Sequence, residues 1–266
     1  MIAIISGATG GLGKSYVMDA VSRGYKVVIT ATKQERLDAL KEEINSKTEG
    51  ACIFAKACNL ADDKSRQDFF DALKKENIVA DMLINNAGYI LEGSFLGCDN
   101  DEIINATKVN CVGTLDFTYK FLKQIDPSKR AYCLIVSSLA GFYPMPQMAV
   151  YGGTKSMLNR FAVALRRELK GKNVHVTACC PGSMATNEDM KLSIKSQGLG
   201  GKLSLQDTSK VARVSINKVL KNKPKYIPGG FNKFMWCLSK LVPETFIANL
   251  LYKRWTKCEK KRNQYR

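Results

Sequence analysis

Tyr151 and Lys155 are four residues apart in a segment of helical pattern, so their side chains lie on one face of a helix. A phenol has an ordinary pKa of about 10 and is a poor acid or base at neutral pH, but a neighbouring ammonium favours its phenolate form. The pair can therefore exchange a proton with a carbonyl or alcohol oxygen. Ser138, thirteen residues before Tyr151, can donate a hydrogen bond to the same oxygen and stabilise the developing negative charge.

A glycine-rich turn, Ser6–Lys14, follows the first apolar run and opens into a helix. Gly7, Gly11 and Gly13 permit a sharp turn and a close approach to a pyrophosphate, which the N–H groups of the helix N-terminus can bind. The spacing is G-x-x-x-G-x-G rather than G-x-G-x-x-G, and a simple tight turn is the alternative. The position after a first strand favours a nucleotide. A bound nicotinamide would supply the hydride, because no side chain can do so.

The end of the second apolar run favours NADP(H) over NAD(H). An acidic residue there would bind the adenosine ribose and exclude a 2′-phosphate, but positions 31–34 hold none. Thr32 can hydrogen-bond a phosphate, and Lys33 can supply a positive charge. The competing interpretation is that Lys33 is an ordinary solvated residue at a helix start.

The elements that must position these residues follow from the apolar pattern. Strands are predicted at Ile2–Ser6, Lys26–Ala31, Cys52–Lys56, Met82–Asn85, Cys133–Ser137 and Val174–Cys180. Helices are predicted at Gln34–Lys47, Asp63–Glu76 and Asp101–Lys123, and another runs on from Tyr151. Continuous apolar strands that alternate with helices indicate a parallel sheet buried on both faces. The predicted fold class is α/β: a single-domain Rossmann-type doubly wound parallel sheet with a C-terminal helical basic extension.

Over roughly residues 2–230, the sequence resembles the short-chain dehydrogenase/reductase family. The resemblance is carried, in family order, by the glycine turn, Asn85-Asn86-Ala87-Gly88, Asn110, Ser138, Tyr151-x-x-x-Lys155 and Pro181-Gly182. It implies an NAD(P)-dependent enzyme acting on CH–OH groups. It also implies that Lys155 holds the nicotinamide ribose and that Asn110 supports a water relay to it. The implied catalytic residues are Asn110, Ser138, Tyr151 and Lys155.

The resemblance also implies a set of cofactor contacts. These are Gly7, Thr9, Gly11, Leu12, Gly13, Thr32, Lys33, Asn59, Leu60, Asn86, Ala87, Gly88, Tyr151, Lys155, Pro181, Gly182 and Thr186. Asn59 stands where the family often has an aspartate that contacts adenine, and an asparagine can still make that polar contact. Family members commonly form dimers or tetramers, so a homo-oligomer is expected.

Composition excludes several other chemistries. The single histidine, His175, rules out a multi-histidine metal site, and its predicted strand favours a structural role. Nine cysteines without a C-x-x-C motif indicate reduced, core-filling thiols, as in a cytoplasmic protein. The sequence shows no secretory leader and no apolar run of about 18 residues that could span a membrane. A cytoplasmic location, with membrane association as an option, is therefore expected.

The positive charge is concentrated near the C-terminus. Of the net +17, residues 202–266 contribute +13, with 16 basic and 3 acidic side chains. The expected division is a catalytic domain at 1–230, with a lid at about 187–204, and a basic amphipathic extension at 231–266 that Pro243 divides into two helices. The extension is expected to cover the substrate pocket or a dimer contact. A peripheral contact with anionic lipid is the alternative. Nucleic acid is not expected, because no binding motif accompanies the charge.

Apolar segments are expected to border the site: Leu139–Pro146, Tyr89–Leu91, Met184 and Met190. Such a lining suits a small lipophilic ketone or secondary alcohol, with a hydroxysteroid-, bile-acid- or acyl-like substrate as the first hypothesis. One alternative is a 3-oxoacyl thioester reductase of lipid metabolism. Another is a non-catalytic cofactor-sensing or membrane-surface protein on the same fold.

Overall fold

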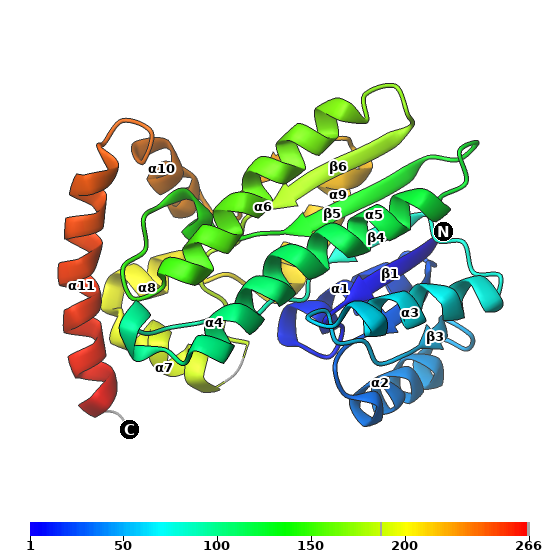
Figure 1. Cartoon of the computed structure of the whole chain (residues 1–266), viewed down its shortest axis with the longest axis horizontal. Helices are drawn as coiled ribbons and strands as arrows, with labels where there is room; N and C mark the ends of the chain where they lie inside the picture. The colour runs from blue at the N-terminus through cyan, green and yellow to red at the C-terminus, as the bar shows by residue number, and fades with distance from the viewer. Residues whose placement is uncertain (187, 265–266) are drawn as a thin grey trace.

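The computed structural model describes residues 1–186 and 188–264 (Figure 1). The strands are β1 (Ile2–Ser6), β2 (Lys26–Thr30), β3 (Cys52–Ala55), β4 (Met82–Asn85), β5 (Ala131–Val136), β6 (Val174–Cys179) and β7 (Lys225–Tyr226). Within the described residues they form one parallel sheet in the order β3-β2-β1-β4-β5-β6-β7. The predicted doubly wound Rossmann sheet is confirmed, and its strand order reverses between β1 and β4, where such folds bind nucleotides.

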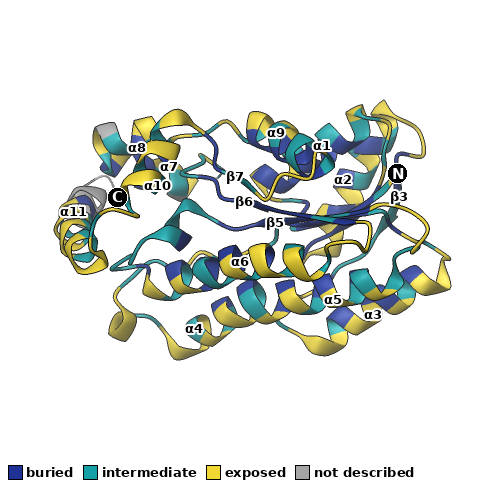
Figure 2. Cartoon of the chain, turned by 90° about the horizontal axis from the view of Figure 1, so that it is seen from above, coloured by how far each residue is buried: buried dark blue, intermediate teal, exposed yellow. Residues whose placement is uncertain are grey.

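Helices cover both faces of the sheet (Figure 2). They are α1 (Gly11–Ser22), α2 (Gln34–Lys47), α3 (Asp63–Lys75), α4 (Asn100–Thr107), α5 (Thr114–Gln124), α6 (Ala149–Glu168), α7 (Glu188–Ser196), α8 (Gly198–Ser204), α9 (Thr208–Leu220), α10 (Gly230–Leu238) and α11 (Glu244–Gln264). Short turns of other helix types are η1 (Phe95–Gly97), η2 (Lys108–Gly113) and η3 (Leu139–Phe142). The helices α1, α2 and α9 pack on one face, and α3, α5 and α6 pack on the other.

Two apolar layers explain the continuous apolar strands. The first layer joins Ile5 and Ile29 of the sheet to Tyr16 of α1 and Ile216 of α9. The second is built around stacked phenylalanines of α3 and α5, with 5.4 Å between the ring centroids of Phe69 and Phe117. Because alternate strand residues face opposite layers, both faces of each central strand must be apolar.

The thiols and the histidine belong to this packing. The neighbours Cys179 and Cys180 lie in opposite layers, and all cysteines of the structure are free. The Nδ1 atom of His175 lies 3.2 Å from the Val219 carbonyl oxygen, and its ring packs edge-on against Tyr132. The described residues include no cluster of His, Cys, Asp or Glu that could hold a metal ion.

The structure corrects the sequence prediction in two places. The helix predicted at Asp101–Lys123 is divided into α4 and α5 by the π-helical segment η2, which contains Asn110. A π turn holds one extra residue, and hydropathy periodicity does not register it. The strand β7 was not predicted, because two residues at a sheet edge carry no recognisable pattern.

The predicted lid and extension form one end of the molecule, where α7, α8, α10 and α11 gather beyond the end of the sheet (Figure 1). Pro243 lies between α10 and α11, as predicted. Of the predicted lid, Asn187 lies outside the described residues, and so do residues 265–266 of the extension. None of the described helices is both long and apolar enough to cross a membrane.

Candidate active site

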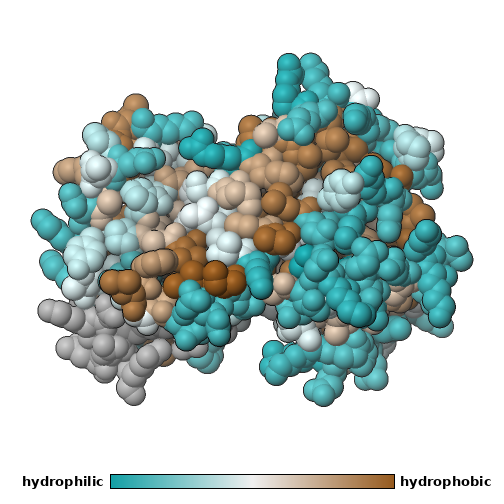
Figure 3. Space-filling view, viewed as in Figure 1, coloured by the Kyte–Doolittle hydropathy of each residue, from teal (hydrophilic) through white to brown (hydrophobic). Residues whose placement is uncertain are grey.

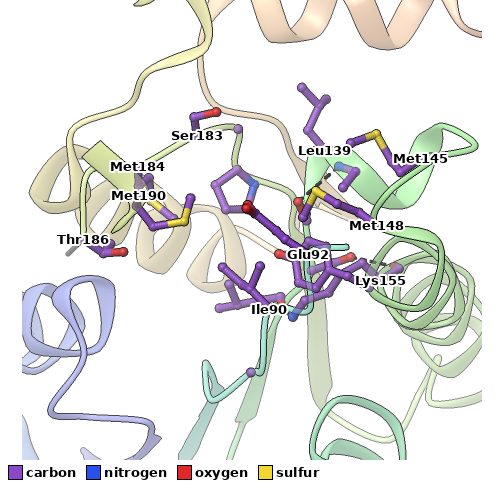
Figure 4. Close-up of a pocket in the computed structure, with 18 of the residues that line it drawn as sticks. Ile90, Glu92, Leu139, Met145, Met148, Lys155, Ser183, Met184, Thr186 and Met190 are labelled. Atoms are coloured by element: carbon purple, nitrogen blue, oxygen red, sulfur yellow. Dashed lines mark hydrogen bonds between the residues drawn. The ribbon is translucent and has the colours of Figure 1, made fainter. Parts of the chain in front are cut away.

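A cavity of about 1020 Å³ opens at the carboxyl ends of the central strands (Figure 4). It is bordered by the glycine turn after β1, the loops that follow β4, β5 and β6, and the first turns of α6. Parallel strands direct all their carboxyl ends to one edge, so segments distant in the sequence meet there. The space-filling view shows apolar side chains beside the hollow between the α7 end and the α1 end of the molecule (Figure 3).

Ser138, Tyr151 and Lys155 all line this cavity. Ser138 ends β5 and caps η3, where its hydroxyl accepts a hydrogen bond from the Ala140 N–H at 3.1 Å. The Lys155 Nζ lies 5.8 Å from the centroid of the Tyr151 ring and donates to the Val136 carbonyl oxygen at 3.0 Å. These contacts fix the ammonium between the end of β5 and the phenol. The three side chains that could perform proton transfer are thus brought together.

The spacing alone predicts that Lys155 favours the phenolate of Tyr151, but the pKa of Tyr151 is raised in the structure. Removal of water from around the phenol raises the pKa of Tyr151, a hydrogen bond with Ser138 lowers it, and the charge of Glu92 raises it again. Burial lowers the pKa of Lys155 to about 8. The net direction for Tyr151 is therefore upward, because desolvation is the largest of these effects and outweighs the hydrogen bond with Ser138. At neutral pH the phenol holds its proton, which suits donation to a carbonyl oxygen.

Asn110 lies behind the cavity and does not line it. Its Oδ1 accepts from the Tyr89 N–H at 2.8 Å, and its Nδ2 donates to the Tyr89 carbonyl at 2.9 Å and to the Thr154 hydroxyl at 3.1 Å. The side chain is completely buried. These contacts connect the loop after β4 to α6, so Asn110 positions the segment that carries Tyr151. Its predicted part in a water relay stays a prediction.

The glycine turn leaves room for a phosphate group. Gly7 has a positive φ of 64°, and a Cβ atom there would lie 2.9 Å from the Cα of Ala87. A Cβ on Gly13 would overlap with the Gly7 carbonyl oxygen. No side chain caps the N-terminus of α1 at Gly10, and its first turn has no acidic residue. The N–H groups and the positive end of the helix dipole thus remain available to an anion, which fits a dinucleotide.

Most of the predicted cofactor contacts border the same cavity. The residues that line it are Gly7, Thr9, Gly11, Leu12, Gly13, Thr32, Asn59, Leu60, Asn86, Ala87, Gly88, Tyr151, Lys155, Pro181, Gly182 and Thr186. Lys33 does not line the cavity; it is exposed directly after Thr32. A Cβ on Gly11 would lie 3.1 Å from the Thr186 Cβ, so the loop after β6 reaches the glycine turn.

Sequence reasoning missed one residue of the cavity, Glu92, and foresaw that Leu139–Pro146 and the C-terminal extension would border it. Glu92, in the loop after β4, brings a carboxylate to the same cavity as Tyr151 and Lys155 (Figure 4). Tyr143 also lines it, and its hydroxyl is buried without a hydrogen-bond partner among the described residues. Glu92 follows a strand in an irregular loop, where no spacing signals a role, whereas Tyr143 belongs to the segment expected to border the site. The apolar residues of α10 and α11 border the cavity, in agreement with the expectation that the extension covers the substrate pocket.

The family profile described as short chain dehydrogenase matches residues 1–197. This chain belongs to the short-chain dehydrogenase family. The match includes the glycine turn, Ser138, Tyr151 and Lys155, and it ends before α10 and α11 begin.

Among curated proteins, the chain is similar to very-long-chain 3-oxoacyl-CoA reductases. It is 34% identical over 178 residues to the one from Neurospora crassa, which covers 65% of this chain and 53% of that protein. It is 29% identical over 190 residues to the one from Bos taurus, covering 69% of this chain and 59% of that protein. The chain thus spans a little over half the length of these relatives.

Solved structures show the same fold. The short-chain dehydrogenase from Sphingobium yanoikuyae in complex with NADPH superimposes with a TM-score of 0.76 at 21% identity, covering 89% of this chain and 91% of that one. The bulky-bulky ketone specific alcohol dehydrogenase from Comamonas testosteroni gives 0.74 at 21% identity, covering 90% and 92%. At this identity the likeness establishes the fold, and the chemistry must be argued from the site.

Proposed function

We propose that this chain is an NADP(H)-dependent oxidoreductase that reduces the 3-oxo group of a lipophilic acyl thioester to a 3-hydroxy group. The observation that carries the proposal is that Ser138, Tyr151 and Lys155 share one cavity with the glycine turn. The names of the curated relatives favour the acyl thioester over the hydroxysteroid that sequence reasoning placed first.

The side chains divide the chemistry of a ketone reduction. The nicotinamide, when bound, supplies the hydride to the carbonyl carbon. The Tyr151 hydroxyl donates its proton to the carbonyl oxygen, and the Ser138 hydroxyl donates a hydrogen bond to the same oxygen. Lys155, with a pKa of about 8, is mainly protonated at neutral pH and stabilises the phenolate that the proton transfer leaves behind. The product is the secondary alcohol.

The cavity favours a hydrocarbon substrate. Leu139, Met145 and Met148 border it near the catalytic residues, and Met184 and Met190 border it from the loop after β6 and from α7 (Figure 4). Methionine side chains are flexible and polarizable, so they adapt to apolar ligands of irregular shape. A sugar or another densely polar metabolite would find few hydrogen-bond partners on this side.

The second strand supports the preference for NADP(H). Thr32 borders the cavity, Lys33 is exposed beside it, and no acidic side chain stands at positions 31–34 to repel a 2′-phosphate. A phosphate at this point could accept a hydrogen bond from the Thr32 hydroxyl and pair with the Lys33 ammonium.

The assembly and location of the protein remain predictions. The family resemblance predicts a homo-oligomer, which sedimentation of the purified chain would measure. Sequence reasoning predicts a cytoplasmic protein with an optional peripheral membrane contact, which fractionation of cells would measure.

The function is tested by the absorbance of the reduced nicotinamide. The purified protein is given NADPH or NADH with acetoacetyl-CoA, 3-oxohexadecanoyl-CoA, a 3-ketosteroid or a plain aliphatic ketone. We expect the 3-oxoacyl thioesters to be reduced with NADPH as the better cofactor. Reduction of the steroid with no turnover of either thioester would overturn the substrate class, and no turnover of any carbonyl would overturn the enzymatic function.

A further inference from the structure

One face of α11 borders the cavity that contains Tyr151. The apolar residues of this face are Phe246, Ile247, Leu250, Leu251, Trp255 and Cys258. They recur every three or four residues, which is the spacing of a single helical stripe. At a rise of about 1.5 Å per residue, the stripe is about 18 Å long. This track is mainly apolar, with Arg254 also bordering the cavity between Leu251 and Trp255, and it forms one wall of the cavity that contains Tyr151.

The C-terminal helices contact the body of the molecule. Trp236 of α10 packs against Phe142 of η3, with 6.0 Å between the ring centroids, and Lys240 places its Nζ 3.9 Å from the centroid of the Trp236 ring. On α11 itself, the guanidinium of Arg254 reaches α8, where a Cβ on Gly200 would overlap with it. The wall that α11 forms is therefore in contact with α7 and, through Arg254, with α8.

The track is not fully covered by protein. Phe246 and Leu250 both border the cavity, yet they are 62% and 59% exposed. When a hydrocarbon covers apolar surface that was in contact with water, the free energy falls. Adjacent positions outside the stripe are different: Tyr252 and Lys253 are exposed and do not border the cavity.

We propose that the acyl chain of the substrate lies along α11, and that the side chains of this stripe set the chain lengths that the enzyme reduces. The inference rests on the proposed function and adds to it the element that selects substrates by the length of their acyl chain. It assigns this selection to α11, which lies beyond the family match at 1–197. The chemistry would then be common to the family, and the selection of chain length would belong to this extension.

The test places a bulky side chain at two points of the stripe. Ile247→Trp and Leu251→Trp are one helical turn, about 6 Å, apart along the track. The control is Tyr252→Trp, which puts the same ring on the exposed side of α11. The kcat/KM of each variant is measured with NADPH and a series of 3-oxoacyl-CoA substrates from acetoacetyl to 3-oxoeicosanoyl.

We expect the two stripe variants to lose about tenfold or more of kcat/KM on the longest substrates and far less on acetoacetyl-CoA. Their cut-off lengths should differ, because the two rings block the track at different points. The control should keep the profile of the unmodified protein. Equal losses at every chain length, or no change in profile, would overturn the inference and leave the proposed function intact. Failure of the unmodified protein to reduce any 3-oxoacyl-CoA would overturn the proposed function instead.

A second measurement needs no turnover. The chain has two tryptophans, so Trp236→Phe leaves Trp255 as the only indole, and Trp255→Phe leaves Trp236. A saturated fatty acyl-CoA that carries bromine on its hydrocarbon chain quenches nearby indole fluorescence. We expect strong quenching in Trp236→Phe and several-fold weaker quenching in Trp255→Phe. Equal quenching of both variants, or none in Trp236→Phe, would contradict an acyl chain that lies along α11.

Discussion

The sheet with its catalytic helix and the C-terminal pair α10 and α11 differ in how closely their side chains are packed. In the sheet region, Gly7 and Gly13 leave no room for a methyl group, and Asn110 is completely buried with its polar atoms bonded to Tyr89 and Thr154. In the C-terminal pair, large apolar side chains such as Phe246 stay mostly exposed. Proton and hydride transfer require fixed distances, whereas a hydrocarbon chain requires only apolar surface. We therefore expect small substitutions in the sheet region to cause large losses of activity or stability.

The largest effect is expected at the proton donor. Tyr151→Phe removes the hydroxyl and keeps the ring. The substrate carbonyl oxygen then has no proton donor, while the cavity keeps its shape. The rate of 3-oxoacyl-CoA reduction should fall about 10³-fold. Binding of NADPH, followed by its fluorescence, should change little. Tyr252→Phe, on the exposed side of α11, is the control and should keep full activity. A Tyr151→Phe variant with near-normal turnover would contradict the assignment.

The next effect concerns the glycine turn. In Gly13→Ala the new methyl group overlaps with the Gly7 carbonyl oxygen, so the turn and α1 must shift. We expect a loss of about 2 kcal/mol in the free energy of unfolding and a much weaker affinity for NADPH. The matched control is Gly153→Ala in α6, where a Cβ meets no atom within 4 Å. It should raise the stability by up to about 1 kcal/mol. Equal stability of the two variants would show that the turn is not closely packed.

A smaller effect is expected at Lys33. A charged partner of a phosphate contributes about 1.5 kcal/mol, so Lys33→Ala should weaken NADPH binding by about tenfold. NADH lacks the 2′-phosphate, and its affinity should stay the same. Titration of both cofactors measures the ratio. Lys41→Ala, at a partly exposed position of α2 that does not border the cavity, serves as the control. A parallel loss of both cofactors would show that Lys33 does not recognise the phosphate.

The smallest effect is a shift of a pH profile. Desolvation is the main cause of the raised pKa of Tyr151, and the charge of Glu92 adds to it. Glu92→Gln removes that charge and should lower the pKa. Oxidation of a 3-hydroxyacyl-CoA requires the phenolate as base, so its rate rises with pH through this pKa. The rising limb should therefore move to lower pH by a fraction of a unit. A limb that moves to higher pH, or does not move, would contradict the role given to Glu92.

Much of the fold and site was predictable from local patterns. Apolar runs such as Ile2–Ser6 and Met82–Asn85 are central strands, and their ends carry the glycine turn and Asn86. The π-helical segment around Asn110 and the two-residue strand β7 escaped prediction because neither alters the hydropathy pattern. Glu92 escaped because loop residues have no periodicity that relates them to a cavity. The direction of the Tyr151 pKa also required the structure, since desolvation depends on the surroundings of the group.

The sequence by itself determined which groups could do chemistry and which lie side by side, because Tyr151 and Lys155 share a helix face at any position of that helix. The tertiary structure alone decided that this helix, the end of β5 and the face of α11 border one cavity. The reason is physical. Spacing along a helix is fixed by covalent and hydrogen-bond geometry, whereas contacts between residues a hundred positions apart depend on how all the apolar surfaces pack together.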